Sequence, residues 1–177
     1  LLLSVMSRGH NNILKFQFFL EVISLFRKER LLEMIEDLVS IPSITESKNE
    51  SLPGIWIKER LEKLPYFIER KDHLIWVETP LEGAREKLHS LVVRVDAPVP
   101  TNRTVLFVGH YDVVDASVYG ENARDAFNVK KITKLLNKNN EDVIYGRGTM
   151  DMKCGIALTI DIIEEFAANR ELFDVNI

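Results

Sequence analysis

The feature that most constrains the fold is the apolar run Thr104-Val105-Leu106-Phe107-Val108, which is followed at once by Gly109. Its side chains are almost all β-branched or aromatic, and polar and apolar positions do not alternate. Such a run is typical of a strand that is buried on both faces, in a sheet covered by helices. We therefore predict a buried strand over residues 104–109.

Segments of two kinds alternate around this run. Residues 73–79, 90–96 and 143–145 have the composition of strands, and residues 174–177 look like the opening of another. Residues 27–40, 52–64 and 152–168 repeat apolar side chains at helical spacing, and Pro42 and Pro65 end the first two helices. This order predicts an α/β fold, a three-layer sandwich with a mixed, mostly parallel central sheet.

The N-terminal stretch is treated separately, because its apolar residues from Ile13 to Phe26 are interrupted by polar ones. It is too short and too polar to span a bilayer. An amphipathic helix or a non-native upstream extension is the plain interpretation, and a helix lying on a membrane surface is the alternative. We assign residues 1–26 to an extension without a function. A membrane is not among the expected partners.

Charge and cysteine content narrow the kinds of partner and site. The net charge is −4 and no long run of Lys and Arg occurs, so a nucleic-acid partner is not expected. The single cysteine, Cys154, excludes an internal disulfide and a four-cysteine zinc site, and it fits a reducing, cytoplasmic location. Any metal would therefore be held by His and carboxylate side chains.

The first chemically suggestive segment is Gly109-His110-Tyr111-Asp112, at the end of the predicted buried strand. His110 and Asp112 are two residues apart, so they project to the same side of an extended backbone. An imidazole binds zinc through one nitrogen while a carboxylate or carbonyl holds its other N–H. A surface histidine followed by an aspartate in a turn is the alternative interpretation.

The second segment, Tyr145-Gly146-Arg147-Gly148-Thr149-Met150-Asp151-Met152-Lys153, links a short predicted strand to a helix. Asp151 lies at the start of that helix, where its carboxylate would either cap backbone N–H groups or bridge two metal ions. For Arg147 and Lys153 we expect structural ion pairs, with steering of an anionic substrate as the alternative. Cys154 is expected to be a small core residue.

Together the two segments resemble the zinc peptidase/deacylase family, which includes carboxypeptidase G, aminoacylase, acetylornithine deacetylase and succinyl-diaminopimelate desuccinylase. The resemblance extends from about Lys28 to Ile177. Within the family the chain is most similar to the subgroup of the arginine-utilisation protein RocB. The resemblance implies that His110 binds one zinc, that Asp151 bridges two, and that Asp112 is the supporting catalytic carboxylate. Cobalt or manganese are alternatives to zinc.

The same resemblance implies hydrolysis of an amide bond beside a free carboxylate, in a small-molecule or short peptide substrate. It also implies a possible homodimer in the intact protein. The family's base is an adjacent pair of glutamates after the next strand, whereas Glu164-Glu165 lies within a predicted helix, where we expect a solvated face. We therefore expect residues 27–177 to be the N-terminal part of a truncated catalytic domain, without the dimerisation domain, and inactive alone. A non-catalytic fragment or relative with a structural or self-association role is the alternative.

Overall fold

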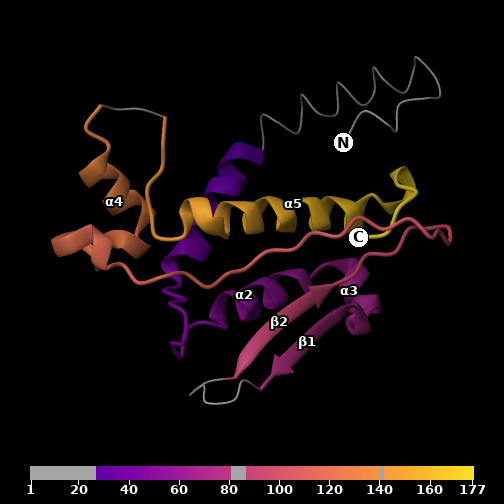
Figure 1. Ribbon diagram of the computed structural model, residues 1–177. Helices are drawn as coiled ribbons and strands as arrows, with labels where there is room; N and C mark the ends of the chain where they lie inside the picture. Colours follow the sequence, from indigo (N-terminus) through magenta and orange to yellow (C-terminus); the bar gives the residue numbers. More distant parts are fainter. Residues whose placement is uncertain (1–26, 81–86, 140–141) are drawn as a thin grey trace.

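The computed structural model describes residues 27–80, 87–139 and 142–177 (Figure 1). The expectations for residues 1–26 lie outside this part of the chain. Within it, no helix combines the length and the apolar character needed to cross a bilayer.

Helix α5 (Cys154–Ala168) runs through the middle of the molecule, with the helix of residues 27–40, α2 (Leu52–Leu61) and α3 (Pro65–Glu69) around it (Figure 1). The helix of residues 27–40, α2 and α5 agree with the predicted segments 27–40, 52–64 and 152–168, whereas α3, which begins at Pro65, was not predicted. The shorter α4 (Val129–Leu136) follows two turns of 3-10 helix, Ser117–Asn122 and Asp125–Phe127, and a further turn spans Arg170–Leu172.

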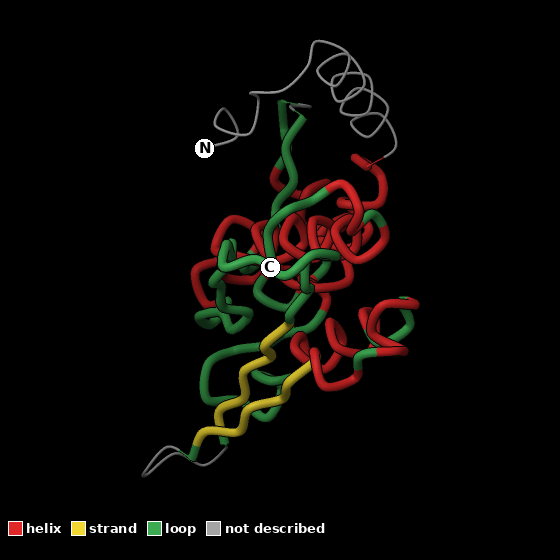
Figure 2. The backbone as a smooth tube through the Cα atoms, turned by 90° about the vertical axis from the view of Figure 1, so that its right-hand side faces the viewer, coloured by secondary structure: helices red, strands yellow, loops and turns green. Residues whose placement is uncertain are grey.

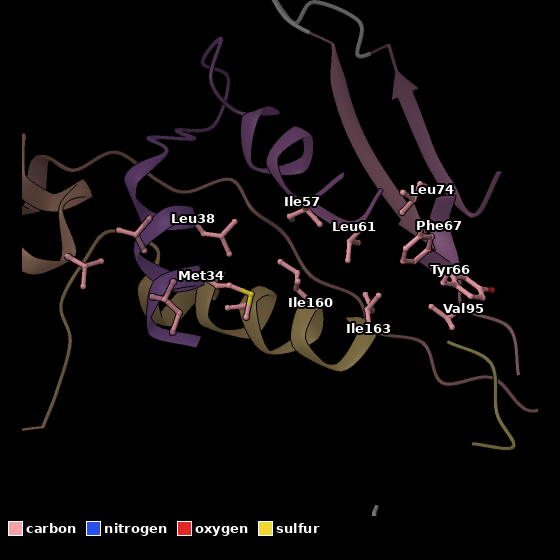
Figure 3. Close-up of a cluster of buried hydrophobic side chains, with 14 residues drawn as sticks. Met34, Leu38, Ile57, Leu61, Tyr66, Phe67, Leu74, Val95, Ile160 and Ile163 are labelled. Atoms are coloured by element: carbon pink, nitrogen blue, oxygen red, sulfur yellow. The ribbon is translucent and has the colours of Figure 1, made fainter. Parts of the chain in front are cut away.

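The core lies where these helices face one another. Ala157, Ile160 and Ile163 form the buried side of α5, at the spacing of one helical face. They belong to one cluster with residues of the 27–40 helix, α2, α3 and β1, including Met34, Leu38, Leu61, Phe67 and Leu74 (Figure 3). Cys154 packs against this cluster, as predicted.

The sheet of the described residues has two antiparallel strands, β1 (Leu74–Thr79) and β2 (Leu88–Val93), paired from Leu74–Val93 to Thr79–Leu88. Both were predicted from their composition. Figure 2 shows the two strands together toward one end of the molecule, with loop segments running on beside the helices. The described part is therefore a mixture of helices and a small antiparallel sheet, and a three-layer sandwich with a mostly parallel sheet is not confirmed.

The prediction of a buried strand over residues 104–109 is wrong for this structure. The segment is extended and exposed, and 81% of the surface of both Leu106 and Val108 is accessible. Only its start is paired, because the N–H of Val105 donates to the carbonyl of Asn176. Ile177 in turn exchanges two backbone hydrogen bonds with Val95, beyond the end of β2. Farther along, no described backbone pairs with residues 106–109, so the run lacks the neighbours that would make it a strand.

Two other predictions for the sheet are corrected. Residues 143–145 do not form a strand, and neither do residues 174–177, which contribute an isolated parallel bridge between Thr104 and Asn176 besides the pairing of Ile177 with Val95. A second parallel bridge joins Ile44 to Val113. These two bridges are the parallel pairings of the described chain, and they lie at the two ends of the segment that carries His110.

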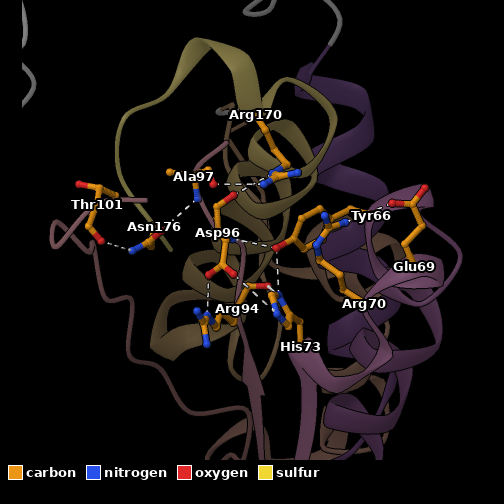
Figure 4. A network of polar contacts seen from close by, with 10 residues as sticks. All are labelled: Tyr66, Glu69, Arg70, His73, Arg94, Asp96, Ala97, Thr101, Arg170 and Asn176. Carbon is orange, nitrogen blue, oxygen red and sulfur yellow. Dashed lines mark hydrogen bonds and ion pairs between the residues drawn. The ribbon is translucent and has the colours of Figure 1, made fainter. Parts of the chain in front are cut away.

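A network of polar groups fastens the C-terminal residues to the end of the hairpin (Figure 4). The Tyr66 hydroxyl contacts Nδ1 of His73 at 2.9 Å and accepts the N–H of Asp96 at 2.8 Å. Arg170 donates to the carbonyl of Asp96 at 2.8 Å and lies over the Tyr66 ring. His73 is buried in this network, and its hydrogen-bond partners Tyr66 and Arg94 compensate for the loss of water around its polar ring.

Two acidic residues of α5 are buried and Glu165 is half-buried, which corrects the expectation of a solvated face around Glu164-Glu165. Glu164 and Asp161 are less than one tenth exposed. Glu164 pairs with Arg60 of α2 at 2.6 Å and also with Arg30. Arg27 pairs with Asp161 at 3.1 Å and also with Glu165. The arginines of two neighbouring helices thus cover this side of α5, and these carboxylates are engaged in holding the helices together.

Candidate metal centre

The two motifs predicted to meet do so at His110 and Asp151, which are 41 residues apart in the sequence. Nε2 of His110 lies 2.9 Å from Oδ1 of Asp151. The other ring nitrogen, Nδ1, lies 3.1 Å from the carbonyl oxygen of Asp112 and 3.3 Å from its carboxylate Oδ1. The two aspartates that were singled out in the sequence therefore lie on either side of the His110 imidazole.

The protonation of His110 follows from these contacts. Burial by itself would lower the pKa of His110, but the hydrogen bond to Asp151, the backbone contact with Asp112 and the charges of both carboxylates raise it above its ordinary value. If Nδ1 carries the proton shared with the Asp112 carbonyl, Nε2 and the Asp151 carboxylate are two acceptors facing each other. A proton or a metal cation between them resolves that conflict.

The loop of residues 43–45 holds the first motif in place. The Ile44–Val113 bridge runs beside it, and the Ser43 hydroxyl donates to the carbonyl of Tyr111 at 2.6 Å. The Thr45 hydroxyl donates to Oδ2 of Asp112 at 3.0 Å. We did not identify Thr45 from the sequence, because the loop around it shows no pattern and the two residues are 67 positions apart.

The second motif is a tight turn packed against the first. Gly148 has a φ of +80°, a backbone conformation that glycine adopts without strain, and an added Cβ there would collide with the side chain of Val113. Gly109 of the first motif also faces Met152 and Ile156 closely, since its added Cβ would lie 2.8 Å from Cδ1 of Ile156. These contacts bring the two motifs together.

Asp151 does not cap the following helix. Its backbone is extended, with φ −129° and ψ 95°, and no side chain caps the N-terminus of α5. Its peptide bond to Met152 is cis. The side chain is 84% exposed and contacts His110. The capping interpretation is therefore wrong, and the Asp151 carboxylate is free to bind a further group.

The ion pairs expected for Arg147 and Lys153 do not occur among the described residues. Arg147 lies over the ring of Tyr119, 5.1 Å from its centroid. Lys153 is completely buried, and its Nζ donates to the carbonyls of Leu38 at 2.8 Å and Ile41 at 2.7 Å. Neither cation faces the site, so the alternative of substrate steering is not supported either.

A groove of about 340 Å³ opens beside the candidate site. His110 and Asp112 line it, together with the exposed segment of residues 105–109, residues of β2 and the buried side of α5. Its walls are largely apolar, through side chains such as Leu91, Phe107 and Ile160. An organic group next to a metal at His110 would therefore meet an apolar surface.

The donors suit zinc, since imidazole nitrogen and carboxylate oxygen are its usual non-sulfur ligands. A catalytic zinc uses three protein ligands, however. In the described ranges no group of three or more His, Cys, Asp or Glu side chains is arranged to hold one ion. His110 and Asp151 fit a metal by their chemistry, and they need further ligands to bind it tightly.

Comparisons with known proteins agree with the motifs. The chain is 30% identical over 150 residues to the uncharacterized protein YqjN of Bacillus subtilis, covering 77% of this chain and 26% of that protein. It is 26% identical over 160 residues to Protein RocB of the same organism, covering 84% and 28%. With the succinyl-diaminopimelate desuccinylase of Verminephrobacter eiseniae the identity is 29% over 147 residues, covering 78% and 32%.

This chain thus spans about a quarter to a third of the length of these curated relatives. Residues 106–177, which include both motifs, match the family described as Peptidase family M20/M25/M40. The predicted family resemblance is therefore confirmed: residues 106–177 are similar to peptidase family M20/M25/M40, and two of the relatives above were named by that resemblance.

Proposed function

We propose that residues 27–177 are the N-terminal part of the catalytic domain of a metal-dependent amide hydrolase. His110 and Asp151 are its metal ligands, and Asp112 is the carboxylate that orients His110. The 2.9 Å contact between His110 Nε2 and Asp151 Oδ1 carries this proposal, because it joins two motifs that the sequence separates. The family match over residues 106–177 supports the reaction class.

Each residue has a role that follows from its contacts. Asp112 holds Nδ1 of His110, so that Nε2 faces the Asp151 carboxylate, and Thr45 holds Asp112 in turn. A pair of zinc ions, or cobalt or manganese in their place, would polarise the amide carbonyl and lower the pKa of a bound water. The apolar groove beside His110 would receive the organic part of the substrate.

The substrate class we propose is an amino-acid-derived amide or a short peptide. The similarity to a succinyl-diaminopimelate desuccinylase supports an acyl amino acid. A place in arginine utilisation is a narrower proposal, which rests on the resemblance to the RocB subgroup. We also propose a cytoplasmic location and a homodimer for the intact protein. The described residues alone are expected to be inactive, because Asp112 and Asp151 are the only carboxylates that contact His110 there.

The proposal is tested by metal binding. Mass spectrometry and equilibrium dialysis with Zn²⁺ are applied to the longest reading frame that contains this sequence, as the wild type, His110→Ala, Asp151→Asn and the control His89→Ala. His89 is a half-buried histidine that stacks on Trp76 and lines the groove, but the polar partners of its ring are Ser51 and Glu78 rather than Asp112 or Asp151. We expect the first two variants to lose bound zinc and the control to retain it. If the wild type takes up no zinc, or if His110→Ala binds as much as the wild type, the proposal fails.

The reaction class is tested in the longest reading frame that contains this sequence. N-acyl amino acids and dipeptides are assayed with and without a chelator. Hydrolysis that stops on chelation and resumes with zinc supports the proposal. Hydrolysis that is indifferent to chelation contradicts it.

One observation favours a second candidate function, self-association without catalysis. The apolar side chains of residues 105–108 are exposed beside backbone that is unpaired in the described structure. Sedimentation of the chain at rising concentrations, compared with Leu106→Lys, tests this candidate. A monomer at every concentration would exclude it.

A further inference from the structure

Lys153 is the only lysine among the fully buried side chains of the described chain, and it has an unusual set of partners. Both hydrogen bonds recorded for its ammonium go to main-chain carbonyls, those of Leu38 and Ile41. No carboxylate forms an ion pair with it in the described structure. Burying a charged ammonium without an opposite charge beside it is energetically unfavourable, so its burial here indicates a structural or functional role.

The two carbonyls explain why a cation is stable at this position. They belong to the last turn of the 27–40 helix and to the residue that follows it, where carbonyls have no partner within the helix. The negative end of the helix dipole also lies there. The Lys153 ammonium therefore joins α5 to the end of a helix that is more than 110 residues away in the sequence.

The same residue closes the turn that carries Asp151. The N–H of Lys153 donates to the carbonyl of Gly148 at 2.8 Å, so residues 148–153 form a closed loop. Asp151 lies inside this loop, and His110 is the partner of its otherwise exposed side chain. The position of the carboxylate therefore depends on the loop backbone, and the loop is anchored through Lys153.

We propose that Lys153 is a positioning residue, which sets the Asp151 carboxylate at the candidate metal centre by fastening the loop of residues 148–153 to the end of the 27–40 helix. The inference rests on the proposed function, since it gives Asp151 the role of a metal ligand. Lys153 itself touches neither the metal position nor the substrate groove.

Cobalt binding to the longest reading frame that contains this sequence provides the first test, because the visible spectrum of Co²⁺ reports its ligands. Lys153→Met keeps the aliphatic stem and removes the ammonium. We expect it to bind Co²⁺ about 10- to 100-fold more weakly, as is usual when a group that orients a ligand is lost. Leu61→Ala is the control for lost stability, and Lys130→Met is the control for lost charge, since Lys130 is exposed and paired with Glu36. Both controls should keep the wild-type affinity per folded molecule.

A double-mutant cycle separates positioning from general weakening of the fold. If Lys153 acts through Asp151, Lys153→Met will cause no further loss of Co²⁺ affinity once Asp151→Asn is present. A full additional loss in the double variant would overturn the inference, as would wild-type affinity in Lys153→Met. Should Lys153→Met fail to fold, Lys153→Gln, which retains two N–H donors, takes its place.

The metal-free protein gives a readout that is independent of the proposed function. In ¹H–¹⁵N spectra, we expect Lys153→Met to shift the amide signals of Asp151 and His110, whereas Lys130→Met leaves them unchanged. Unchanged signals in Lys153→Met would overturn the inference. If the wild type binds no Co²⁺ but these signals move, the proposed metal site fails and the positioning of Asp151 stands.

Discussion

The two segments that supply His110 and Asp151 are held in opposite ways. The turn of residues 146–153 is packed on both sides, with Gly148 against Val113 and the Lys153 side chain inserted under the 27–40 helix. The segment of residues 104–110 is exposed along its length and is paired only near its ends. The site therefore has one firmly supported side and one side that relies on backbone contacts with residues 43–45 and 176.

The largest difference between the two sides should appear when apolar side chains are shortened. Leu38 is fully buried at the end of the helix that receives Lys153, and Leu106 is exposed. We expect Leu38→Ala to lower the free energy of unfolding by about 2–5 kcal/mol. Leu106→Ala should change it by less than about 0.5 kcal/mol. Urea denaturation measures both, and equal losses would refute the comparison.

A pair of glycine variants sharpens the comparison at the turn itself. Gly148→Ala should lower the free energy of unfolding by about 1–3 kcal/mol for its positive φ, and by more because the new Cβ meets Val113. Gly120→Ala reports backbone strain without a collision, because Gly120 has φ +55° and ψ −125° and nothing lies within 4 Å of its added Cβ. Thermal denaturation should show the larger loss for Gly148→Ala. Equal losses would mean that the packing of the turn contributes nothing.

A pH titration of stability tests whether the Lys153 anchor is truly buried. The pKa of Lys153 is lowered from 10.5 to about 8, so between these values the unfolded chain binds more protons than the folded one. The free energy of unfolding should therefore rise with pH in this window, by at most about 1.4 kcal/mol per pH unit. Lys153→Met should lack this rise. A stability that falls equally in both proteins would contradict the burial of the ammonium.

The smallest effect is expected at His110, on the exposed side. Its pKa is raised above 6.5, so its contribution to stability is present below that pH and is lost as the pH rises through the folded pKa. NMR titration of the imidazole should show a midpoint above 6.5 in the wild type and a lower one in Asp151→Asn. An identical midpoint in both would mean that the two side chains do not interact in solution.

Sequence patterns predicted the parts of the fold that depend on local periodicity. Three helices and the two paired strands were found in this way, whereas α3 and α4 were not predicted. The two motifs indicated that His110 and Asp151 would meet. The exposure of residues 105–108 was not predicted, because apolar composition indicates a strand but not whether neighbouring strands are there to cover it. The roles of Thr45 and Lys153 were missed as well. Both depend on contacts between distant segments, which leave no local pattern.

The polar network around Asp96 affects the order in which this chain folds during synthesis. Asn176 accepts the N–H of Ala97, and Arg170 donates to the carbonyls of Asp96 and Ala97, across more than 70 residues. The hairpin and the first helices leave the ribosome long before these partners do. The segment of residues 95–105, which leads to His110, therefore lacks these partners until residue 176 has emerged. Until then this segment of the nascent chain is open to proteases and chaperones.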